Sequence, residues 1–293
     1  MKIYSPAKIN LFLNITGKRP DGYHDLVSLI CCLGLFDRVT LEIGVPHTII
    51  TCNDSKVPQN ETNLARRAAA CFYQKLSHHS PKAFEHVAIH IDKRIPVAAG
   101  LGGGSSNAAA VLIGLNRYYR DWFSQSDLMV MGQSIGADVP FFIFRRPAIA
   151  TGIGEQLEFF NGLQPYHILL VWPGFEVSTT EVFDNLDLGL TNCEKKLTKN
   201  LLKNRPYNAA DHLCNDLEPV VAKKYSEIIE IKETLLRHGA AGASMSGSGP
   251  TVFGLFADID TAQNAHQALA RHRTWRLFLT DMLFDSEYRI TDT

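Results

Sequence analysis

The sequence lacks a long hydrophobic run, an excess of charge of either sign and a paired cysteine motif. No apolar stretch approaches the roughly 20 residues of a membrane-spanning helix, and no basic segment followed by an apolar one opens the chain as a secretory signal would. The 29 basic and 30 acidic residues give a net charge of −1, so no bulk field favours nucleic acid or an anionic membrane. These absences favour a cytoplasmic protein that acts on a small molecule.

The cysteines show no Cys-x-x-Cys pair and no regular spacing with histidine. Such patterns mark disulfide frameworks and zinc sites. We therefore expect six reduced thiols. They are Cys31, Cys32, Cys52, Cys71, Cys193 and Cys214.

Length and composition favour two globular domains. A chain of 293 residues with 45% hydrophobic content can bury a large core. Turn-rich residues 151–154 separate a first half of mixed strand and helix patterns from a second half, which begins with a continuous apolar run at 167–172. We expect one domain at 1–160 and another at 161–293.

Strand patterns are frequent in the first half. Apolar and polar residues alternate over 8–15, which is the period of a half-buried strand, and Lys8 and Asn10 then share one face of it. The alternation recurs at 39–43 and at 87–91. These segments predict a sheet with a solvent-facing side.

Helical spacing appears between the predicted strands. Apolar residues at 64–72 recur with a helical period, and a second helix fits between an N-cap at Ser126 and Gly136. Later in the chain, a long helix is expected from Pro219 in its first turn to Gly239 beyond its end, and a shorter one at 261–272. The chain is therefore mixed α and β.

The most informative segment is a glycine-rich stretch at 100–106, which follows the strand pattern at 87–91 and precedes an alanine-rich helix. Glycines at this density let successive backbone N–H groups converge on an anion, and the helix points its positive end at the same place. An isolated glycine cluster could be an ordinary flexible turn, but the flanking strand and helix favour a phosphate site.

This stretch is neither of the two common nucleotide loops. It has no lysine before its serines, as a P-loop requires, and Ser105 stands where a dinucleotide fingerprint has its third glycine. The acidic residue of that fingerprint is also missing. A different phosphate cradle is therefore indicated.

Three elements stand in order along the chain, at 5–11, 96–106 and 246–250. The set resembles the GHMP kinase superfamily, whose members carry three such motifs in this order. The resemblance implies an ATP-dependent kinase with a two-domain α/β (α+β) fold. Its N-terminal domain would resemble ribosomal protein S5 domain 2, and its C-terminal domain would be ferredoxin-like.

Within the superfamily, segments 5–11, 19–24, 136–142 and 215–218 resemble the branch that phosphorylates the 2-hydroxyl of a cytidyl diphosphate-linked methylerythritol in non-mevalonate isoprenoid synthesis. One alternative is a kinase for mevalonate, homoserine or a sugar, against which the Pro-Asp-Gly-Tyr-His run ending at His24 argues. Another is a non-catalytic ligand-binding relative that has kept the fold and lost the chemistry.

Phosphoryl transfer needs a group that takes the hydroxyl proton, a cation that holds the phosphoryl charge and a cradle that aligns the reactants. Asp138, between the helix breakers Gly136 and Pro140, is the candidate general base. An isolated aspartate would more often bond its own backbone in a turn, and an isolated Lys8 would lie in solvent. The resemblance favours a catalytic Lys8–Asp138 pair instead.

The remaining site residues come from the resemblance. Tyr23 and Phe183 would stack on cytosine and His24 would bond its Watson–Crick edge, although Phe183 has the loosest match. Mg²⁺ is expected to arrive with ATP. Ser106 is a candidate ligand, and the sequence does not single out an acidic residue as a second ligand. Substrate contacts are assigned to Asn10, Tyr23, His24, Asp138, Thr179 and Phe183. ATP contacts are assigned to Asn63, Leu64, Lys93, Pro96, Gly100, Leu101, Gly102, Gly103, Gly104, Ser105 and Ser106.

Overall fold

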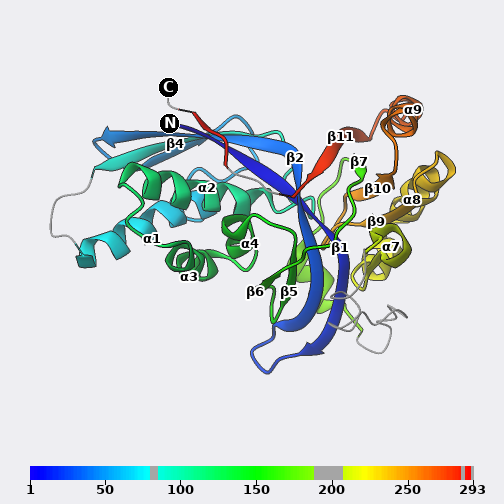
Figure 1. The fold of residues 1–293 in the computed structure, drawn as a ribbon, viewed down its shortest axis with the longest axis horizontal. Coiled ribbons are helices and arrows are strands. Elements are labelled where there is room, and N and C mark those ends of the chain that lie inside the picture. Colours follow the sequence, from blue (N-terminus) through cyan, green and yellow to red (C-terminus); the bar gives the residue numbers. More distant parts are fainter. Residues whose placement is uncertain (80–84, 188–206, 285–287, 292–293) are drawn as a thin grey trace.

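The computed structural model describes residues 1–79, 85–187, 207–284 and 288–291. Figure 1 shows two halves side by side. In one half, helices α1 to α4 lie against strands that include β4, and in the other, helices α7 to α9 lie outside β7, β9, β10 and β11. The long β1–β2 hairpin passes between the halves.

The described elements have the following bounds. The strands are β1 (Lys2–Lys18), β2 (His24–Val45), β3 (Ile49–Cys52), β4 (His86–Asp92), β5 (Ala148–Thr151), β6 (Gln156–Phe159), β7 (His167–Trp172), β8 (Cys214–Asn215), β9 (Gly242–Met245), β10 (Val252–Phe256), β11 (Arg276–Leu283) and β12 (Ile290–Thr291). The helices are α1 (Leu64–His79), α2 (Gly103–Tyr118), α3 (Gln125–Ile135), α4 (Val139–Phe144), α5 (Thr179–Asp184), the 3₁₀ helix η2 (Ala209–His212), α7 (Glu218–Lys224), α8 (Glu227–Arg237) and α9 (Ile259–Leu269).

Strand β2 joins the two halves into one hydrogen-bonded sheet. It pairs with β1, β4 and β5, and its Leu33 pairs with Met282 of β11. From β11 the pairing continues through β7 and β10 to β9. Side chains on the middle of β1 therefore lie where the two halves meet.

The chain returns to the N-terminal half at its end. Strand β12 pairs with β1, and Tyr288 packs in the same core cluster as Phe72 and Phe142. The division at 160/161 stays a prediction, with these last described residues lying against the first half.

The strand expected at 8–15 is confirmed as part of β1, but the expectation that one of its faces is exposed is wrong. Lys8, Asn10 and Phe12 on the polar face are as buried as Ile9 on the other. The alternation correctly shows which residues share a face. It could not show that Gly247 from the far end of the chain covers that face, where a Cβ atom on Gly247 would lie 3.2 Å from Lys8 Nζ.

Three predicted helices differ from the structure. Helix α9 spans Ile259–Leu269, where 261–272 was expected. The N-cap of α3 is Ser124, whose side chain accepts from the Asp127 backbone in a reciprocal capping box, and not Ser126. The long helix expected from Pro219 is two helices, because the chain leaves helical geometry at Tyr225, where φ is −130°. Gly239 lies beyond the end of α8 with φ +91°, as expected.

The cysteines are not all free thiols. Cys31, Cys32, Cys52 and Cys71 are free, but Cys214 is disulfide-bonded, so the expectation of six reduced thiols is wrong. Spacing along a sequence does not show which thiols approach in space. Cys193 lies outside the described residues.

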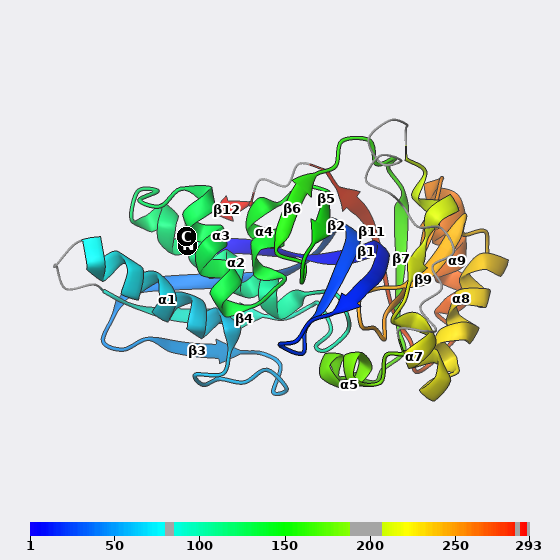
Figure 2. The same cartoon turned by 90° about the horizontal axis from the view of Figure 1, so that it is seen from below.

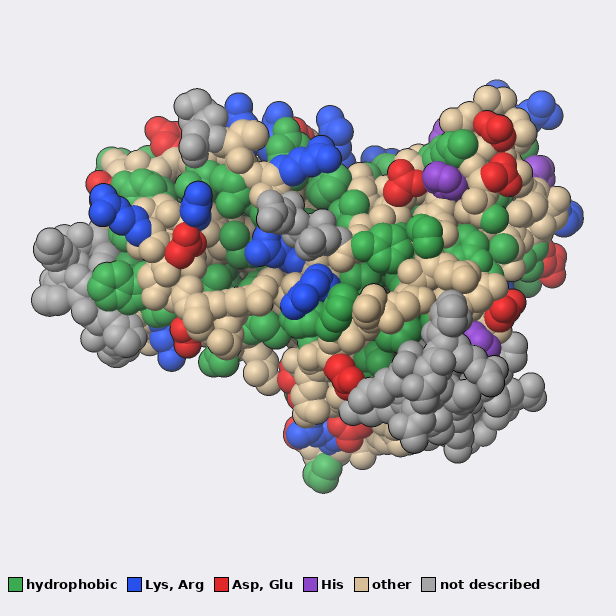
Figure 3. Space-filling model, viewed as in Figure 1, with side chains coloured by type: hydrophobic (Ala, Val, Ile, Leu, Met, Phe, Trp, Pro, Cys, Tyr) green, Lys and Arg blue, Asp and Glu red, His purple; other side chains and the backbone are tan. Residues whose placement is uncertain are grey.

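The surface carries mixed charge. Acidic and basic side chains are interspersed with hydrophobic ones on the face in Figure 3. No helix in the described part of the chain is long and apolar enough to cross a membrane.

Candidate active site

A cavity of about 590 Å³ opens between the two halves. Its wall includes the middle of β1, the first part of β2, the loop before α2, the N-terminus of α1, and α5 with the loop after β9. Figure 2 shows α5 beside the β1–β2 hairpin. Of the residues assigned from sequence, those that line the cavity are Lys8, Asn10, Asn63, Leu64, Lys93, Pro96, Gly100, Gly102, Gly103, Gly104, Ser105, Asp138, Thr179 and Phe183.

The phosphate loop, residues 96–105, ends in an uncapped helix N-terminus. Gly102 precedes α2 with φ +69°, and no side chain of the described residues caps the helix. The first N–H groups of a helix have no partner within it. Because Gly103, Gly104 and Ser105 all line the cavity, these donors fit an anionic phosphate group.

The third motif, residues 246–250, holds the phosphate loop from the C-terminal half. Ser246 Oγ donates to the Gly100 carbonyl at 2.9 Å. Gly100 has φ +74°, and a Cβ atom there would overlap the carbonyl oxygen of Ser246. Only glycine fits at position 100, because a side chain there would push the third motif away from the phosphate loop.

Lys8 and Asp138 form an ion pair at the cavity. Lys8 Nζ lies 3.6 Å from Asp138 Oδ2, and the lysine side chain is 6% exposed against 40% for the aspartate. Lys8 Nζ also donates to Asn10 Oδ1 at 2.6 Å. The structure therefore brings the two predicted catalytic residues together, with the carboxylate still accessible.

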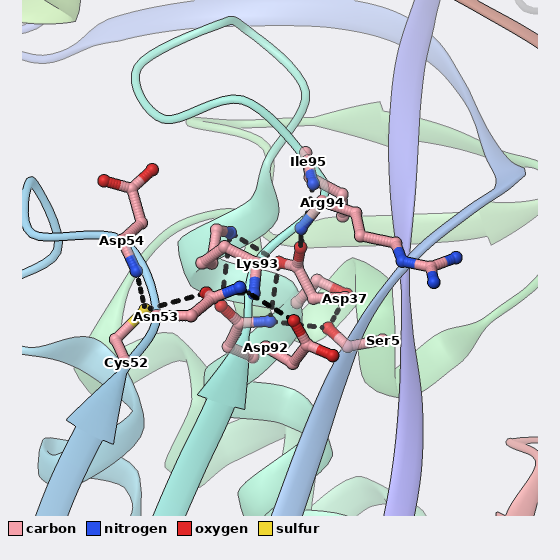
Figure 4. Close-up of polar contacts among 11 residues, drawn as sticks. Ser5, Asp37, Cys52, Asn53, Asp54, Asp92, Lys93, Arg94 and Ile95 are labelled. Atoms are coloured by element: carbon pink, nitrogen blue, oxygen red, sulfur yellow. Dashed lines mark hydrogen bonds and ion pairs between the residues drawn. The ribbon is translucent and has the colours of Figure 1, made fainter.

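Asp37, which the sequence analysis did not single out, organises the segment that leads into the phosphate loop (Figure 4). Its carboxylate is fully buried and forms an ion pair with Lys93. It also accepts from the backbone N–H groups of Arg94 and Ile95 at 2.8 and 2.9 Å, and from Asn107 Nδ2 of α2 at 3.0 Å. One carboxylate thus holds the lysine, the loop and the helix.

The same network fixes Lys93 beside α2. A Cβ atom on Gly103 would lie 2.9 Å from Lys93 Nζ, so the ammonium group packs against the first turn of the helix. The Lys93 backbone N–H donates to Asn53 Oδ1 at 2.7 Å. This placement puts the lysine at the cavity wall, next to the helix donors.

Two residues assigned to ATP do not line the cavity. The Ser106 hydroxyl is buried and accepts from Ser5 Oγ at 2.7 Å. Leu101 packs in the core shared by the two halves, and its carbonyl accepts from the Lys8 backbone at 3.0 Å. Ser105, and not Ser106, has its place at the cavity.

The residues assigned to the substrate that accepts the phosphoryl group are only partly brought together. Thr179 lies 2.8 Å from Ser248 of the third motif, oxygen to oxygen, and the Phe183 ring lies 5.3 Å from the His24 ring. Burial, with Lys18 nearby, lowers the pKa of His24, which favours a neutral imidazole. Tyr23 is 59% exposed and does not line the cavity.

The segment 215–218 braces the site and does not line it except at Leu217. Asn215 Nδ2 donates to the carbonyls of Met245 and Gly247 at 2.8 Å. Asp216 accepts from the Ile15 backbone at 2.8 Å. These contacts tie β1 to the third motif.

Comparison with known proteins first gives the class. Residues 63–146 match the GHMP kinase N-terminal domain and residues 197–273 match the GHMP kinase C-terminal domain. The homoserine kinase of Cytophaga hutchinsonii shares the fold with a TM-score of 0.75 at 17% identity, over 97% of this chain and 94% of that one. Fold and site define a GHMP kinase, as the sequence motifs predicted.

Closer relatives narrow the assignment. The 4-diphosphocytidyl-2-C-methyl-D-erythritol kinases of Syntrophotalea carbinolica and Syntrophus aciditrophicus are each 43% identical over 282 residues, covering 96% and 95% of this chain and 98% of each relative. A crystal structure of 4-(cytidine 5'-diphospho)-2C-methyl-D-erythritol kinase matches with a TM-score of 0.76 and 33% identity, over 96% of this chain and 99% of that one. The chain belongs to the 4-diphosphocytidyl-2-C-methyl-D-erythritol kinase family.

Proposed function

We propose that the protein transfers the γ-phosphoryl group of ATP to the 2-hydroxyl of 4-diphosphocytidyl-2-C-methyl-D-erythritol, in non-mevalonate isoprenoid synthesis. The observation that carries this is the Lys8–Asp138 pair, 3.6 Å apart in the cavity that the phosphate loop also lines. An acid–base pair and a phosphate cradle in one cavity are what phosphoryl transfer to an alcohol requires.

The ATP phosphates are assigned to the helix donors at Gly103 and Gly104. These groups, with the N-terminal end of the α2 dipole, stabilise negative charge without any rearrangement. Lys93 adds a positive charge that Asp37 holds in place. The nucleoside is then directed toward Asn63, at the N-terminus of α1, which also lines the cavity.

Asp138 is assigned as general base and Lys8 as the cation of the transfer step. The half-exposed carboxylate accepts the proton of the acceptor hydroxyl as the oxygen attacks. The buried Lys8 ammonium group, next to it, stabilises charge that develops on the transferring phosphoryl group. Removal of water from around Lys8 strengthens this attraction.

Magnesium is assigned to the nucleotide and not to a protein cage. No group of three His, Cys, Asp or Glu side chains among the described residues is placed to bind a metal ion. Mg²⁺ commonly keeps water and substrate phosphates as ligands and takes few ligands from protein. A site without a cluster of protein ligands among the described residues therefore fits an ion that enters with ATP. When bound, Mg²⁺ would neutralise phosphate charge.

The test is phosphoryl transfer by the purified protein with ATP, Mg²⁺ and a panel of acceptors. The proposed function predicts ADP release that depends on the cytidyl acceptor, with a new monophosphate signal in ³¹P NMR. Turnover with mevalonate, homoserine or a sugar in its place would assign another GHMP kinase. Binding of ATP and of the cytidyl compound without turnover would identify a non-catalytic relative.

A further inference from the structure

Ser28 of β2 lies at the end of a short chain of hydrogen bonds that leads to Lys8. Its hydroxyl donates to the Phe12 carbonyl at 2.6 Å and accepts from Asn10 Nδ2 at 2.8 Å. Asn10 Oδ1 in turn accepts from Lys8 Nζ at 2.6 Å. All three polar side chains are buried.

The direction of these hydrogen bonds follows from the Phe12 carbonyl at one end of the series. A carbonyl can only accept, so the single hydroxyl proton of Ser28 is used on Phe12 and its oxygen must accept from Asn10. Asn10 therefore turns its NH₂ group to Ser28 and its carbonyl to Lys8. An ammonium group can only donate, so this is the one amide orientation that suits Lys8.

We propose that Ser28 is a positioning residue for phosphoryl transfer, which acts through Asn10 to hold the Lys8 ammonium group beside Asp138. This rests on the proposed function, since it assigns a role in that same reaction. Asn10 is bonded to Ser28 through its NH₂ group and to Lys8 through its carbonyl, so it can transmit the position of Ser28 to Lys8.

The surroundings restrict other ways of holding Lys8. A Cβ atom on Gly247 would lie 3.2 Å from Lys8 Nζ and 3.3 Å from Asn10 Oδ1, so the backbone of the third motif covers the pair. Without the Ser28 hydroxyl, the Asn10 NH₂ group loses its acceptor, and the Asn10 side chain is free to leave its position. Its Oδ1 atom then no longer holds the Lys8 ammonium group beside Asp138.

Ser28 also lines the cavity, so a direct contact with the acceptor is the competing explanation. The two roles separate kinetically. A positioning role lowers kcat and leaves both KM values nearly unchanged, whereas a direct contact raises the acceptor KM.

The experiment compares Ser28→Ala, Ser28→Thr, Asn10→Ala and the double variant Ser28→Ala/Asn10→Ala. We expect Ser28→Ala to lose about 10-fold to 100-fold in kcat, the loss that a displacement of about one ångström can cause. Ser28→Thr, which keeps the hydroxyl, should stay within a few-fold of wild type. Because Ser28 acts through Asn10, the double variant should be no slower than Asn10→Ala.

Three results would overturn the proposal: an unchanged kcat in Ser28→Ala, a rise in acceptor KM alone, or additive losses in the double variant. A second measurement does not depend on turnover. The Asn10 side-chain amide signals in NMR should be protected from hydrogen exchange in the wild type and lose that protection in Ser28→Ala, and equal exchange in both would also contradict the role. Wild-type protein that does not turn over the cytidyl acceptor would instead count against the proposed function.

Discussion

Lys8 Nζ lies 3.6 Å from Asp138 Oδ2, with the lysine enclosed and the carboxylate open to the cavity. Lys8 comes from the middle of β1, and Asp138 is the residue that precedes α4. The asymmetry suits a reaction in which the acceptor hydroxyl must reach the carboxylate while the ammonium group keeps its charge away from bulk water. Each partner therefore has a separately testable role.

Replacement of Asp138, the proposed general base, should abolish most of the turnover. Asp138→Asn keeps the shape of the side chain and removes its basicity, so we expect kcat to fall by about 10²-fold to 10⁴-fold. ATP affinity measured by calorimetry should stay nearly unchanged. Asp121→Asn is the matched control, because that aspartate is exposed and forms a surface ion pair with Arg117. Turnover of Asp138→Asn within a few-fold of wild type would mean that proton removal does not depend on this carboxylate.

The phosphate loop allows a sharper test with two glycines of the same segment. A Cβ atom on Gly102 would lie 2.8 Å from the Phe142 ring and 3.1 Å from Lys8 Cγ, at φ +69°. A Cβ atom on Gly104 would meet only Leu64, at 3.7 Å. Gly102→Ala should thus weaken ATP binding strongly and lower the thermal midpoint, while Gly104→Ala should fold and melt like wild type. Equal ATP affinity of folded Gly102→Ala and wild type in calorimetry would remove this turn from the nucleotide site.

Many of the strands and helices could be predicted because they depend on local sequence patterns. The strand at 167–172 is β7 as expected, and the helical spacing from Leu64 begins α1. The resemblance of the three motifs to those of GHMP kinases also predicted that distant glycine-rich segments belong to one site. Hydrophobic period and turn residues are local properties, so they can be read without knowing the neighbours.

Burial and partners could not be predicted in the same way. Asp37 precedes a strand pattern at 39–43 like any turn aspartate, and only the approach of β4 and α2 makes it a buried anchor. Ser28 has no motif at all, and its role depends on pairing between β1 and β2. Tyr23 lies beside His24 in sequence, yet the hairpin leaves it exposed. Such features depend on what packs against a segment.

The buried Asp37–Lys93 ion pair should contribute to stability because each charge neutralises the other. Asp37→Asn leaves the Lys93 ammonium group buried without its counter-charge, which we expect to cost about 3–5 kcal/mol of unfolding free energy. Adding Lys93→Met should restore most of that loss, because the unpaired charge is then gone. Urea denaturation of both single variants and the double variant measures this. Simple additivity of the two losses would show that the residues do not act as a pair.

The aromatic contact with the acceptor should be carried by Phe183, which lines the cavity, more than by exposed Tyr23. If Phe183 stacks on cytosine, Phe183→Ala should lose about 1–3 kcal/mol of acceptor binding, or about 5-fold to 150-fold in acceptor KM. The ring is remote from the reacting hydroxyl, so kcat and ATP affinity should change little. Phe159→Ala, at an exposed aromatic outside the cavity wall, is the control. Tyr23→Ala tests the sequence-based assignment directly. A rise in its KM equal to that of Phe183→Ala would show that Tyr23 reaches the base, and an unchanged KM in Phe183→Ala would exclude Phe183 as a stacking partner.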